Sequence, residues 1–449
     1  MKKILLFGAG RSATTLIDYL LKLCEDKGWT LAIGDADFET AKRKCNGKAR
    51  AFAFDVSNEG QLLQEIGQVD LVISMLPAMY HQLVANVCLD QGKHLVTASY
   101  VTQEMRDMDE AVKEKDLVFL NECGLDPGID HMSAMAVIDR IRSNNYKLIG
   151  FESFTGGLLA PNTHDNPWQY KFTWNPRNVV LAGQGYVKFI QQGRYKYIPY
   201  QRLFRRTEVI HIPGYGYFEG YANRDSLKYL DVYNLRGIET LYRGTLRRPG
   251  FCKAWDVFVQ LGATDDSYKI ENAEGMTHRQ FINSFLFYNP DDSIELKLAY
   301  YLNLPMDSEE MHRLKWLGVF SEEVITLKEG TPAQVLEHIL KKKWTLDEAD
   351  NDMIVMWHKF NYVNDAGKEF EEHSTMVSIG EDPMHTAMSK TVGLPLAIAT
   401  KLILEGTIFT PVVKIPIQKE IYEPILAELK EFGFDFIEET IDLEEVARG

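Results

Sequence analysis

The sequence is poor in cysteine and has no run of apolar residues that approaches the roughly 18–20 needed to span a membrane. Its five cysteines are scattered and never spaced as C-x-x-C, so neither a disulfide framework nor a zinc site is indicated. The start of the sequence, residues 1–7, is basic and then apolar. Gly8 ends the apolar part too soon for a secretory signal, so we expect a strand there. We therefore expect a cytoplasmic protein with no membrane partner.

Positive charge is also scarce. Lys and Arg total 49 against 64 Asp and Glu, a net charge of -15, which argues against nucleic acid as a partner. There is no P-loop, no G-x-S-x-G elbow, no H-E-x-x-H and no His/Cys cluster among the 11 histidines. We therefore expect no bound metal and no serine nucleophile in a globular chain of two or three domains.

The first 125 residues alternate short apolar runs with helical patterns, as βαβ units do. Predicted strands cover Lys3–Phe7, Thr30–Gly34, Ala51–Asp55, Leu71–Met75, His94–Thr97 and Val118–Leu120, with helices between them. The predicted fold class is therefore α/β, with a doubly wound parallel sheet of the Rossmann type.

The composition of the sequence changes after Gly128. Residues 151–301 are rich in aromatics and glycine, with β-type stretches at Thr207–Ile212 and Tyr215–Tyr221, which predicts an α+β domain with an antiparallel sheet. We predict a Rossmann domain at 1–130, an α+β domain at 131–305 and a small helical domain at 306–350. An apolar helix near 386–405 is expected to return to the first module, so residues 385–449 would complete it.

A glycine-rich turn joins the first predicted strand to the first helix. In Gly8-Ala-Gly-Arg-Ser-Ala13, Gly8 permits a tight turn and Gly10 lets the backbone approach a pyrophosphate. The helix that follows offers free N–H groups and a positive dipole end. This pattern predicts a dinucleotide site.

The choice of dinucleotide depends on the end of the second strand. A carboxylate there, Asp35, accepts hydrogen bonds from a ribose 2′-OH and repels a 2′-phosphate, which favours NAD. Arg43 and Lys44 could offset this charge, so NADP stays open. A turn or N-cap role is the alternative interpretation of Asp35.

Other polar segments follow the later strands, where ligands of such sheets bind. Residues 74–77 follow the fourth strand and residues 97–100 the fifth, and His81 opens the next helix as a functional, capping or packing residue. Asp126 precedes Pro127 and Gly128 in the densest polar segment, where it either acts in the site or starts the turn.

Two arginines of the second domain are candidate anion ligands. Arg224 and Arg243 lie in short polar segments, and a substrate with several carboxylates calls for planar, bidentate donors. Gly244 would let backbone N–H groups join them. A surface or interdomain salt bridge is the alternative for each arginine.

With these residues in view, the chain from residue 3 to about 440 resembles the saccharopine reductase family, the L-glutamate-forming saccharopine dehydrogenases of lysine metabolism. The resemblance is carried by six ordered blocks: 124–131, 165–174, 223–226, 243–247, 314–318 and 391–395. It implies a Rossmann domain, an α+β domain for saccharopine binding and dimerisation, and a small helical domain.

The resemblance also implies site residues. Cofactor contacts would fall on Gly8, Gly10, Arg11, Ser12, Asp35, Asp55, Val56, Leu76, Thr97, Leu125, Asp126, Pro127 and Asn175. Saccharopine would be bound by Ser99, Tyr100, Asp126, Arg224, Arg243, Gly244 and Thr245, with Asp126 and Tyr100 as the catalytic candidates. The fungal members carry Cys-Arg in place of Gly34-Asp35 and use NADP, and they carry a cysteine where this chain has Thr155.

The expected reaction is the reversible NAD(P)-dependent oxidation of saccharopine to glutamate and 2-aminoadipate 6-semialdehyde by a homodimer. One alternative is a related C–N-forming dehydrogenase, such as a carboxynorspermidine synthase, whose more cationic substrate would call for acidic residues in place of Arg224 and Arg243. The other is a non-enzymatic NAD-binding Rossmann protein.

Overall fold

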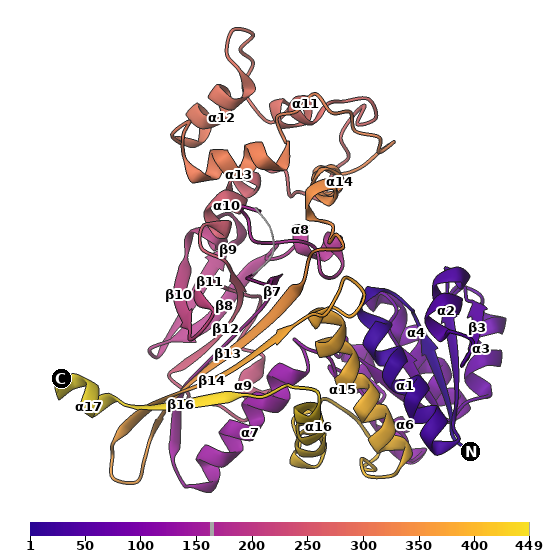
Figure 1. Ribbon diagram of the computed structural model, residues 1–449. Helices are drawn as coiled ribbons and strands as arrows, with labels where there is room; N and C mark the ends of the chain where they lie inside the picture. Colours follow the sequence, from indigo (N-terminus) through magenta and orange to yellow (C-terminus); the bar gives the residue numbers. More distant parts are fainter. Residues whose placement is uncertain (162–165, 449) are drawn as a thin grey trace. The chain divides into compact units, whose positions relative to one another are not determined.

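The structure is a computed structural model that describes residues 1–161 and 166–448. The chain forms two compact units (Figure 1). The first contains Met1–Leu148, Tyr362–Glu369 and Met376–Glu439, and the second contains Ile149–Asn361, Phe370–Thr375 and Thr440–Gly449. The helices predicted as a separate small domain belong to the second unit, and the three-domain division stays a prediction.

The first unit contains a seven-stranded parallel sheet with the order β15-β6-β5-β4-β1-β2-β3. The strands are β1 (Lys3–Phe7), β2 (Thr30–Asp35), β3 (Arg50–Ala53), β4 (Leu71–Ser74), β5 (His94–Thr97), β6 (Val118–Leu120) and β15 (Val412–Lys414). The predicted α/β class is confirmed. Leu5, Val72 and Leu95, from neighbouring strands, lie in the buried core on one face of this sheet.

Helices and short 3-10 turns connect these strands. They are η1 (Arg11–Ala13), α1 (Thr14–Lys27), α2 (Phe38–Cys45), α3 (Glu59–Gly67), η2 (Ala78–Tyr80), α4 (His81–Gln91), α5 (Gln103–Asp107), α6 (Asp109–Glu114), α7 (Ile129–Ser143), α15 (Ala387–Leu404) and α16 (Lys419–Glu431). Asp37 caps α2, because its carboxylate accepts hydrogen bonds from the N–H groups of Glu39 and Thr40.

Helix α15 lies beside α1 (Figure 1). The two approach closely at Gly393, where a Cβ would come within 2.8 Å of the Leu16 nitrogen, and the Ser389 hydroxyl accepts a hydrogen bond from Thr15 N at 3.0 Å. By length and composition α15 could cross a membrane, so the expectation that no apolar segment approaches that length was wrong. Of its 18 residues, 83% are buried inside the protein, which is how a core helix packs.

The second sheet has nine strands and includes the order β10-β11-β12-β7-β13-β14-β16, with β8 paired to β12 and β9. The strands are β7 (Lys147–Leu159), β8 (Tyr186–Gln191), β9 (Arg194–Pro199), β10 (Thr207–Ile212), β11 (Gly216–Ala222), β12 (Thr240–Arg247), β13 (Asp352–Val363), β14 (Glu369–Ile379) and β16 (Ile437–Asp442). The expected antiparallel sheet was wrong in one respect: β12 pairs in parallel with β7. The long connection between them, residues 160–239, allows that crossover.

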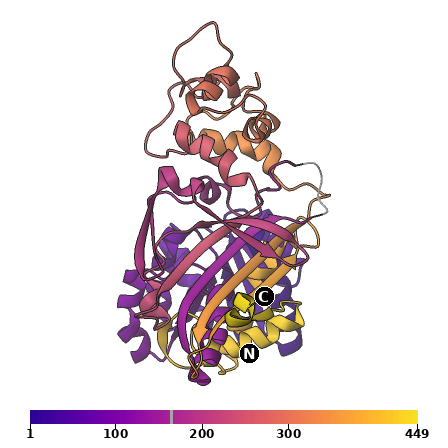
Figure 2. The ribbon, with the colours of Figure 1, turned by 90° about the vertical axis from the view of Figure 1, so that its left-hand side faces the viewer.

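Most helices of the second unit gather at one end of it in both views (Figures 1 and 2). The helices are α8 (Pro176–Val180), α9 (Tyr229–Val232), α10 (Phe251–Leu261), α11 (His278–Asn283), α12 (Ile294–Leu302), α13 (Glu309–Leu317), α14 (Pro332–Trp344) and α17 (Leu443–Arg448), with the 3-10 turn η3 (Tyr200–Arg205). The ring of Trp344 lies 5.0 Å from that of Tyr170 and 5.3 Å from that of Trp168. These buried aromatic contacts hold α14 in the core.

Candidate active site

The predicted site residues of the first unit follow the carboxyl ends of its strands. They are Gly8–Ser12 after β1, Asp35 at the end of β2, Asp55 and Val56 after β3, Leu76 after β4, Thr97, Ser99 and Tyr100 at and after β5, and Leu125–Pro127 after β6. Because the strands are parallel, these positions share one edge of the sheet. The structure therefore brings them together where a doubly wound sheet binds its ligands.

The glycine-rich turn has the form that a pyrophosphate needs. Gly8 has a φ of 98° and donates its N–H to Gly34 O at 2.9 Å, and an added Cβ would meet Met75 O at 2.9 Å. Gly10 has an ordinary φ of -63°, and nothing lies within 4 Å of where its Cβ would be. The open space over Gly10, followed by η1 and α1, fits a dinucleotide.

A carboxylate and an ammonium group flank this turn. Asp35 accepts hydrogen bonds from Ala9 N at 2.5 Å and from Asp37 N at 2.8 Å. Lys44 Nζ donates to Gly10 O at 2.6 Å and lies 2.9 Å from the Thr14 hydroxyl. Burial, and then the nearby charge of Arg43, lowers the pKa of Lys44 to about 8. Two of the three groups considered for cofactor choice, Asp35 and Lys44, are therefore at the turn.

The two catalytic candidates are in contact with each other. Asp126 is half-buried in the loop after β6, and the Tyr100 hydroxyl donates to its Oδ1 at 3.4 Å. The Asp126–Pro127 peptide bond is cis. Asp130 accepts a hydrogen bond from Gly128 N at 2.6 Å and so fastens the start of α7 to this loop.

Glu122 is a residue that the sequence did not indicate. It is 5% exposed, and its carboxylate lies 2.8 Å from His131 Nε2 and accepts the Val101 N–H at 3.0 Å. Its own N–H donates to Ser99 O at 3.0 Å. Glu122 therefore ties the segment that carries Ser99 and Tyr100 to the segment that leads to Asp126.

A second buried histidine, His81, lies between two serines. Its Nδ1 is 2.8 Å from the Ser74 hydroxyl and its Nε2 is 2.6 Å from the Ser99 hydroxyl. Burial lowers the pKa of His81 to about 4. The imidazole is therefore neutral at neutral pH.

The second unit carries the remaining predicted residues. Arg243 on β12 is 8% exposed, and its guanidinium carbon lies 4.1 Å from the centre of the Tyr229 ring. Thr245, two residues along the same strand, hydrogen-bonds Tyr221 and pairs with Thr155 on β7. The Thr155 hydroxyl is buried and has no hydrogen-bond partner among the described residues. The side chains of Arg243 and Thr245 lie on the same face of the sheet, because residues two apart on a strand point the same way. Thr155 lies on that face as well, because it is paired with Thr245.

Four predicted residues have the following local surroundings. Gly244 leaves room for the ring of Phe154, which a Cβ would overlap. Arg224 is exposed, with a φ of 52°, in the connection between β11 and α9. Asn175 caps α8 by accepting Arg177 N at 3.0 Å. Asp55, in the first unit, accepts hydrogen bonds from Ser57 and closes the turn after β3.

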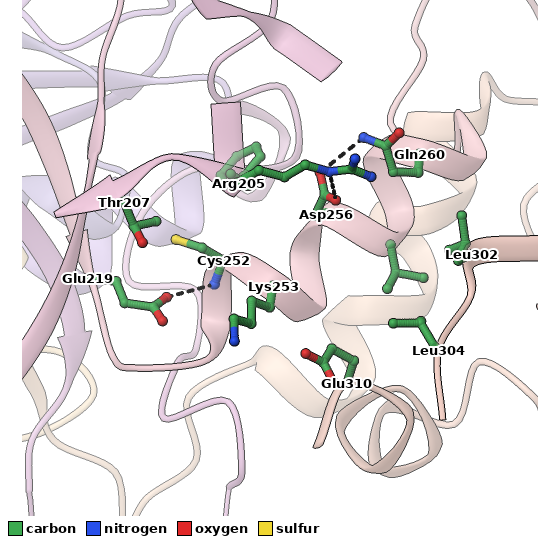
Figure 3. A pocket seen from close by; sticks show the side chains of 12 residues that line it. Arg205, Thr207, Glu219, Cys252, Lys253, Asp256, Gln260, Leu302, Leu304 and Glu310 are labelled. Carbon is green, nitrogen blue, oxygen red and sulfur yellow. Dashed lines mark hydrogen bonds and ion pairs between the residues drawn. The ribbon is translucent and has the colours of Figure 1, made fainter. Parts of the chain in front are cut away.

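A pocket of about 370 Å³ lies elsewhere in the second unit, between β10, β11, α10 and the start of α13 (Figure 3). Its polar groups are largely engaged: Arg205 Nε donates to Asp256 at 2.7 Å, and Glu219 accepts the N–H groups of Gly250 and Cys252. The predicted site residues do not line it. This pocket is therefore not the candidate active site.

No set of three or more metal-ligating side chains occurs in residues 1–161 and 166–448. Asp165, the first residue of one of the motifs above, lies outside the described residues.

Comparison with known proteins identifies the family. Two family models match: "Saccharopine dehydrogenase NADP binding domain" over residues 4–120 and "Saccharopine dehydrogenase C-terminal domain" over residues 124–434. The saccharopine dehydrogenase [NADP(+), L-glutamate-forming] of Schizosaccharomyces pombe is 32% identical over 455 residues, which cover 99% of this chain and 100% of that protein. The chain belongs to the saccharopine dehydrogenase family.

Other members support this. The same enzyme of Saccharomyces cerevisiae is 32% identical over 452 residues, which cover 98% of this chain and 99% of that one. The solved apo saccharopine dehydrogenase (L-Glu forming) of S. cerevisiae has a TM-score of 0.89 and 30% identity and covers 98% of this chain and 100% of that one. The family resemblance and fold class are confirmed, and residues 4–120 of this saccharopine dehydrogenase family member form an NAD(P)-binding domain.

Proposed function

We propose that this chain catalyses the reversible NAD(P)-dependent oxidation of saccharopine to glutamate and 2-aminoadipate 6-semialdehyde, a reaction of lysine metabolism. The full-length match to the S. pombe enzyme, named for saccharopine and for the formation of L-glutamate, is the observation that carries the proposal. The geometry at the carboxyl edge of the first sheet and the buried Arg243 on β12 support the same reaction.

The carboxylates of saccharopine give Arg224 and Arg243 a role in substrate binding. Saccharopine joins the nitrogen of glutamate to the terminal carbon of a 2-aminoadipate skeleton and so carries three carboxylates. We assign Arg243, held against Tyr229, and the exposed Arg224 to two of these carboxylates. A charge-assisted hydrogen bond of this kind contributes roughly 1.5–3 kcal/mol.

The reaction also needs proton transfer. Oxidation at the C–N bond produces an imine, and water must add to that imine before glutamate leaves. We assign the Asp126 carboxylate and the Tyr100 hydroxyl, which are 3.4 Å apart, to holding and moving these protons. A nicotinamide dinucleotide bound at Gly8–Ser12 supplies the hydride acceptor.

One assay tests the function. Purified protein is mixed with saccharopine and either NAD or NADP, and the absorbance of the reduced nicotinamide is followed. We expect turnover, with glutamate as a product. Dinucleotide binding without turnover would support a non-enzymatic role instead, and activity only with a carboxylated polyamine would support the related C–N-forming dehydrogenase.

We propose further that NAD is the preferred dinucleotide. Asp35 supports this, because a carboxylate at the end of β2 favours a free ribose 2′-OH over a 2′-phosphate. The S. pombe and S. cerevisiae relatives are named as NADP(+) enzymes, so the proposed preference is the reverse of theirs. Lys44 lies at the same turn, and its positive charge would offset the repulsion between Asp35 and a 2′-phosphate.

Replacing Asp35 by asparagine tests this preference. Asp35→Asn keeps an oxygen that can accept the Ala9 N–H but removes the negative charge, so kcat/KM with NADP should rise ~10-fold or more relative to NAD. Asp37→Asn is the matched control, because Asp37 caps α2 and its exposed carboxylate binds Glu39 and Thr40. A wild-type preference for NADP, or an unchanged ratio in Asp35→Asn, would contradict the assignment.

A homodimer is the proposed assembly. Four tyrosines on β8, β9 and β11 are 61–65% exposed, and such a surface is suited to burial against a second copy: Tyr186, Tyr195, Tyr197 and Tyr217. Light scattering of the purified protein should give twice the mass of the chain, and a monomer mass would contradict the proposal. We also propose a cytoplasmic location, which the five free, buried cysteines support.

A further inference from the structure

Three polar side chains lie together at the carboxyl edge of the first sheet. Ser74 is the last residue of β4, His81 is the first residue of α4, and Ser99 follows β5. β4 and β5 are neighbours, with Ser74 opposite Thr97. The turn η2 between Ser74 and His81 brings the imidazole back over the ends of both strands.

The three side chains form a hydrogen-bonded chain. His81 Nδ1 lies 2.8 Å from Ser74 Oγ, and His81 Nε2 lies 2.6 Å from Ser99 Oγ. Ser74 is 1% exposed and His81 is 5% exposed, whereas Ser99 is only half-buried. The chain therefore runs from a buried serine, through the imidazole, to a serine at the ligand-binding edge.

A neutral imidazole gives this chain a direction. It has one N–H, so it donates to one serine and accepts from the other. In the first arrangement, Ser74 donates to Nδ1 and Nε2 donates to Ser99. In the second arrangement, Ser99 donates to Nε2 and Nδ1 donates to Ser74.

The burial of Ser74 selects the first arrangement. In the second, the Ser74 hydroxyl proton would need another acceptor, and the described part of the chain places none within hydrogen-bond reach of Ser74 Oγ. A buried donor without an acceptor is destabilising, so Ser74 gives its proton to Nδ1. Nε2 then carries the hydrogen and donates to Ser99 Oγ.

This arrangement determines what Ser99 can do. Its oxygen already accepts the hydrogen of Nε2, and no other acceptor for its own proton lies within reach in the described part of the chain. That proton is therefore directed at a ligand, and an anionic oxygen is the acceptor it would bind most strongly.

We propose that His81 is a positioning residue, which holds the Ser99 hydroxyl as a hydrogen-bond donor to a carboxylate of the substrate. The proposal rests on the proposed function and on the contact between Ser99 and saccharopine that the family resemblance implies. In this proposal, the buried Ser74 determines which nitrogen of the His81 ring carries the hydrogen. Neither Ser74 nor His81 contacts the reacting atoms.

The tautomer is measured without any turnover. Protein labelled with ¹⁵N-histidine is examined by NMR at neutral pH, and the His81 signals are assigned by their loss in His81→Gln. We expect Nε2 to carry the hydrogen and Nδ1 to have the shift of an unprotonated nitrogen. A hydrogen on Nδ1 would overturn the proposal.

Kinetics tests the connection to the substrate. His81→Phe keeps a ring but removes both nitrogens, so KM for saccharopine should rise ~10-fold or more, with a much smaller change in kcat. His81→Gln can present an N–H to Ser99 and should recover most of the loss. Ser99→Ala should raise KM as much as His81→Phe, and combining the two substitutions should add nothing further.

His94→Gln is the matched control. His94 is also a partly buried histidine of this unit with a pKa lowered by burial, but it begins β5 at the opposite edge and accepts Val118 N at 3.1 Å. This variant should keep the wild-type KM for saccharopine. Dinucleotide affinity is measured for every variant to show that the unit is folded.

The possible failures are distinguishable. An unchanged KM in His81→Phe that binds dinucleotide normally, or effects of His81→Phe and Ser99→Ala that multiply, would overturn the proposal. If wild-type protein does not oxidise saccharopine, the proposed function fails, and the tautomer still decides the direction of the hydrogen-bonded chain. If His81→Phe does not fold, the tautomer and the KM of Ser99→Ala decide the question, because an unchanged KM in Ser99→Ala would overturn the proposal.

Discussion

Replacing the two glycines of the dinucleotide turn one at a time separates the stability of the turn from its capacity to bind. At Gly8 the φ of 98° is one that L-residues adopt at a cost of about 1–2 kcal/mol. The new Cβ would also lie 2.9 Å from Met75 O, a backbone atom that cannot rotate away. Overpacking of this kind costs about 1–3 kcal/mol more, so Gly8→Ala should lower the free energy of unfolding by roughly 2–5 kcal/mol.

Gly10→Ala should behave in the opposite way. Its φ of -63° suits alanine, and nothing lies within 4 Å of the new Cβ, so stability should be unchanged or higher by about 0.4–1 kcal/mol. The methyl group, however, would occupy the space through which a pyrophosphate approaches the backbone. We expect dinucleotide affinity to fall by ~10-fold or more.

Each variant is the control for the other. Denaturant unfolding followed by circular dichroism measures stability, and isothermal titration with NAD and NADP measures affinity. The reasoning would be refuted if Gly10→Ala kept the wild-type affinity, or if it unfolded as easily as Gly8→Ala.

Two further predictions follow from other parts of the site. Arg243→Met should raise KM for saccharopine ~10-fold or more, and Arg243→Lys should recover little of it, because an ammonium cannot form a bidentate pair; equal KM values for Arg243→Lys and wild type would contradict this. His81 makes the fold acid-sensitive: burial lowers its pKa from 6.5 to about 4, so between these pH values the unfolded chain binds a proton that the folded chain does not. The free energy of unfolding should therefore fall by up to about 3 kcal/mol as the pH drops through this window, and His81→Gln should remove that part of the slope in denaturant titrations at each pH.

The first unit could be predicted closely from the sequence. The ranges of β1, β5 and β6 agree residue for residue with the prediction, and α4 begins at His81 as predicted. Strands buried on both faces are short, nearly continuous apolar runs, and each is followed by a helix of clear periodicity. Local sequence therefore carries enough information for this part of the fold.

The second sheet could not be predicted as well. β14 carries polar residues such as Glu369, Glu371 and His373 over much of its length, so its apolar/polar alternation is weak. The parallel pairing of β12 with β7 depends on the long connection between them, and the sequences of the two strands do not indicate its direction. These strands form because of partners that are distant in the sequence, which override local preference.

The residues of the candidate site could likewise be predicted only in part. Asp35 and Asp126 were found because strand ends in this topology meet at one edge. Glu122 was missed, and the role of His81 stayed undecided between function, cap and packing, because their partners Val101, His131, Ser74 and Ser99 come together only in the folded chain. The assignment of substrate-binding residues stays a prediction.

The return of α15 to α1 has a consequence for biosynthesis. Leu16, Ile17 and Leu20 of α1 are fully buried, and α15, which packs against this helix, is translated more than three hundred residues later. The apolar face of α1 is therefore exposed on the nascent chain for most of elongation. Such exposed apolar surface is prone to aggregation, which chaperones limit. A premature stop codon between residue 370 and the start of α15 would yield a product that still carries Gly8–Ser12 and yet lacks the helix that covers α1.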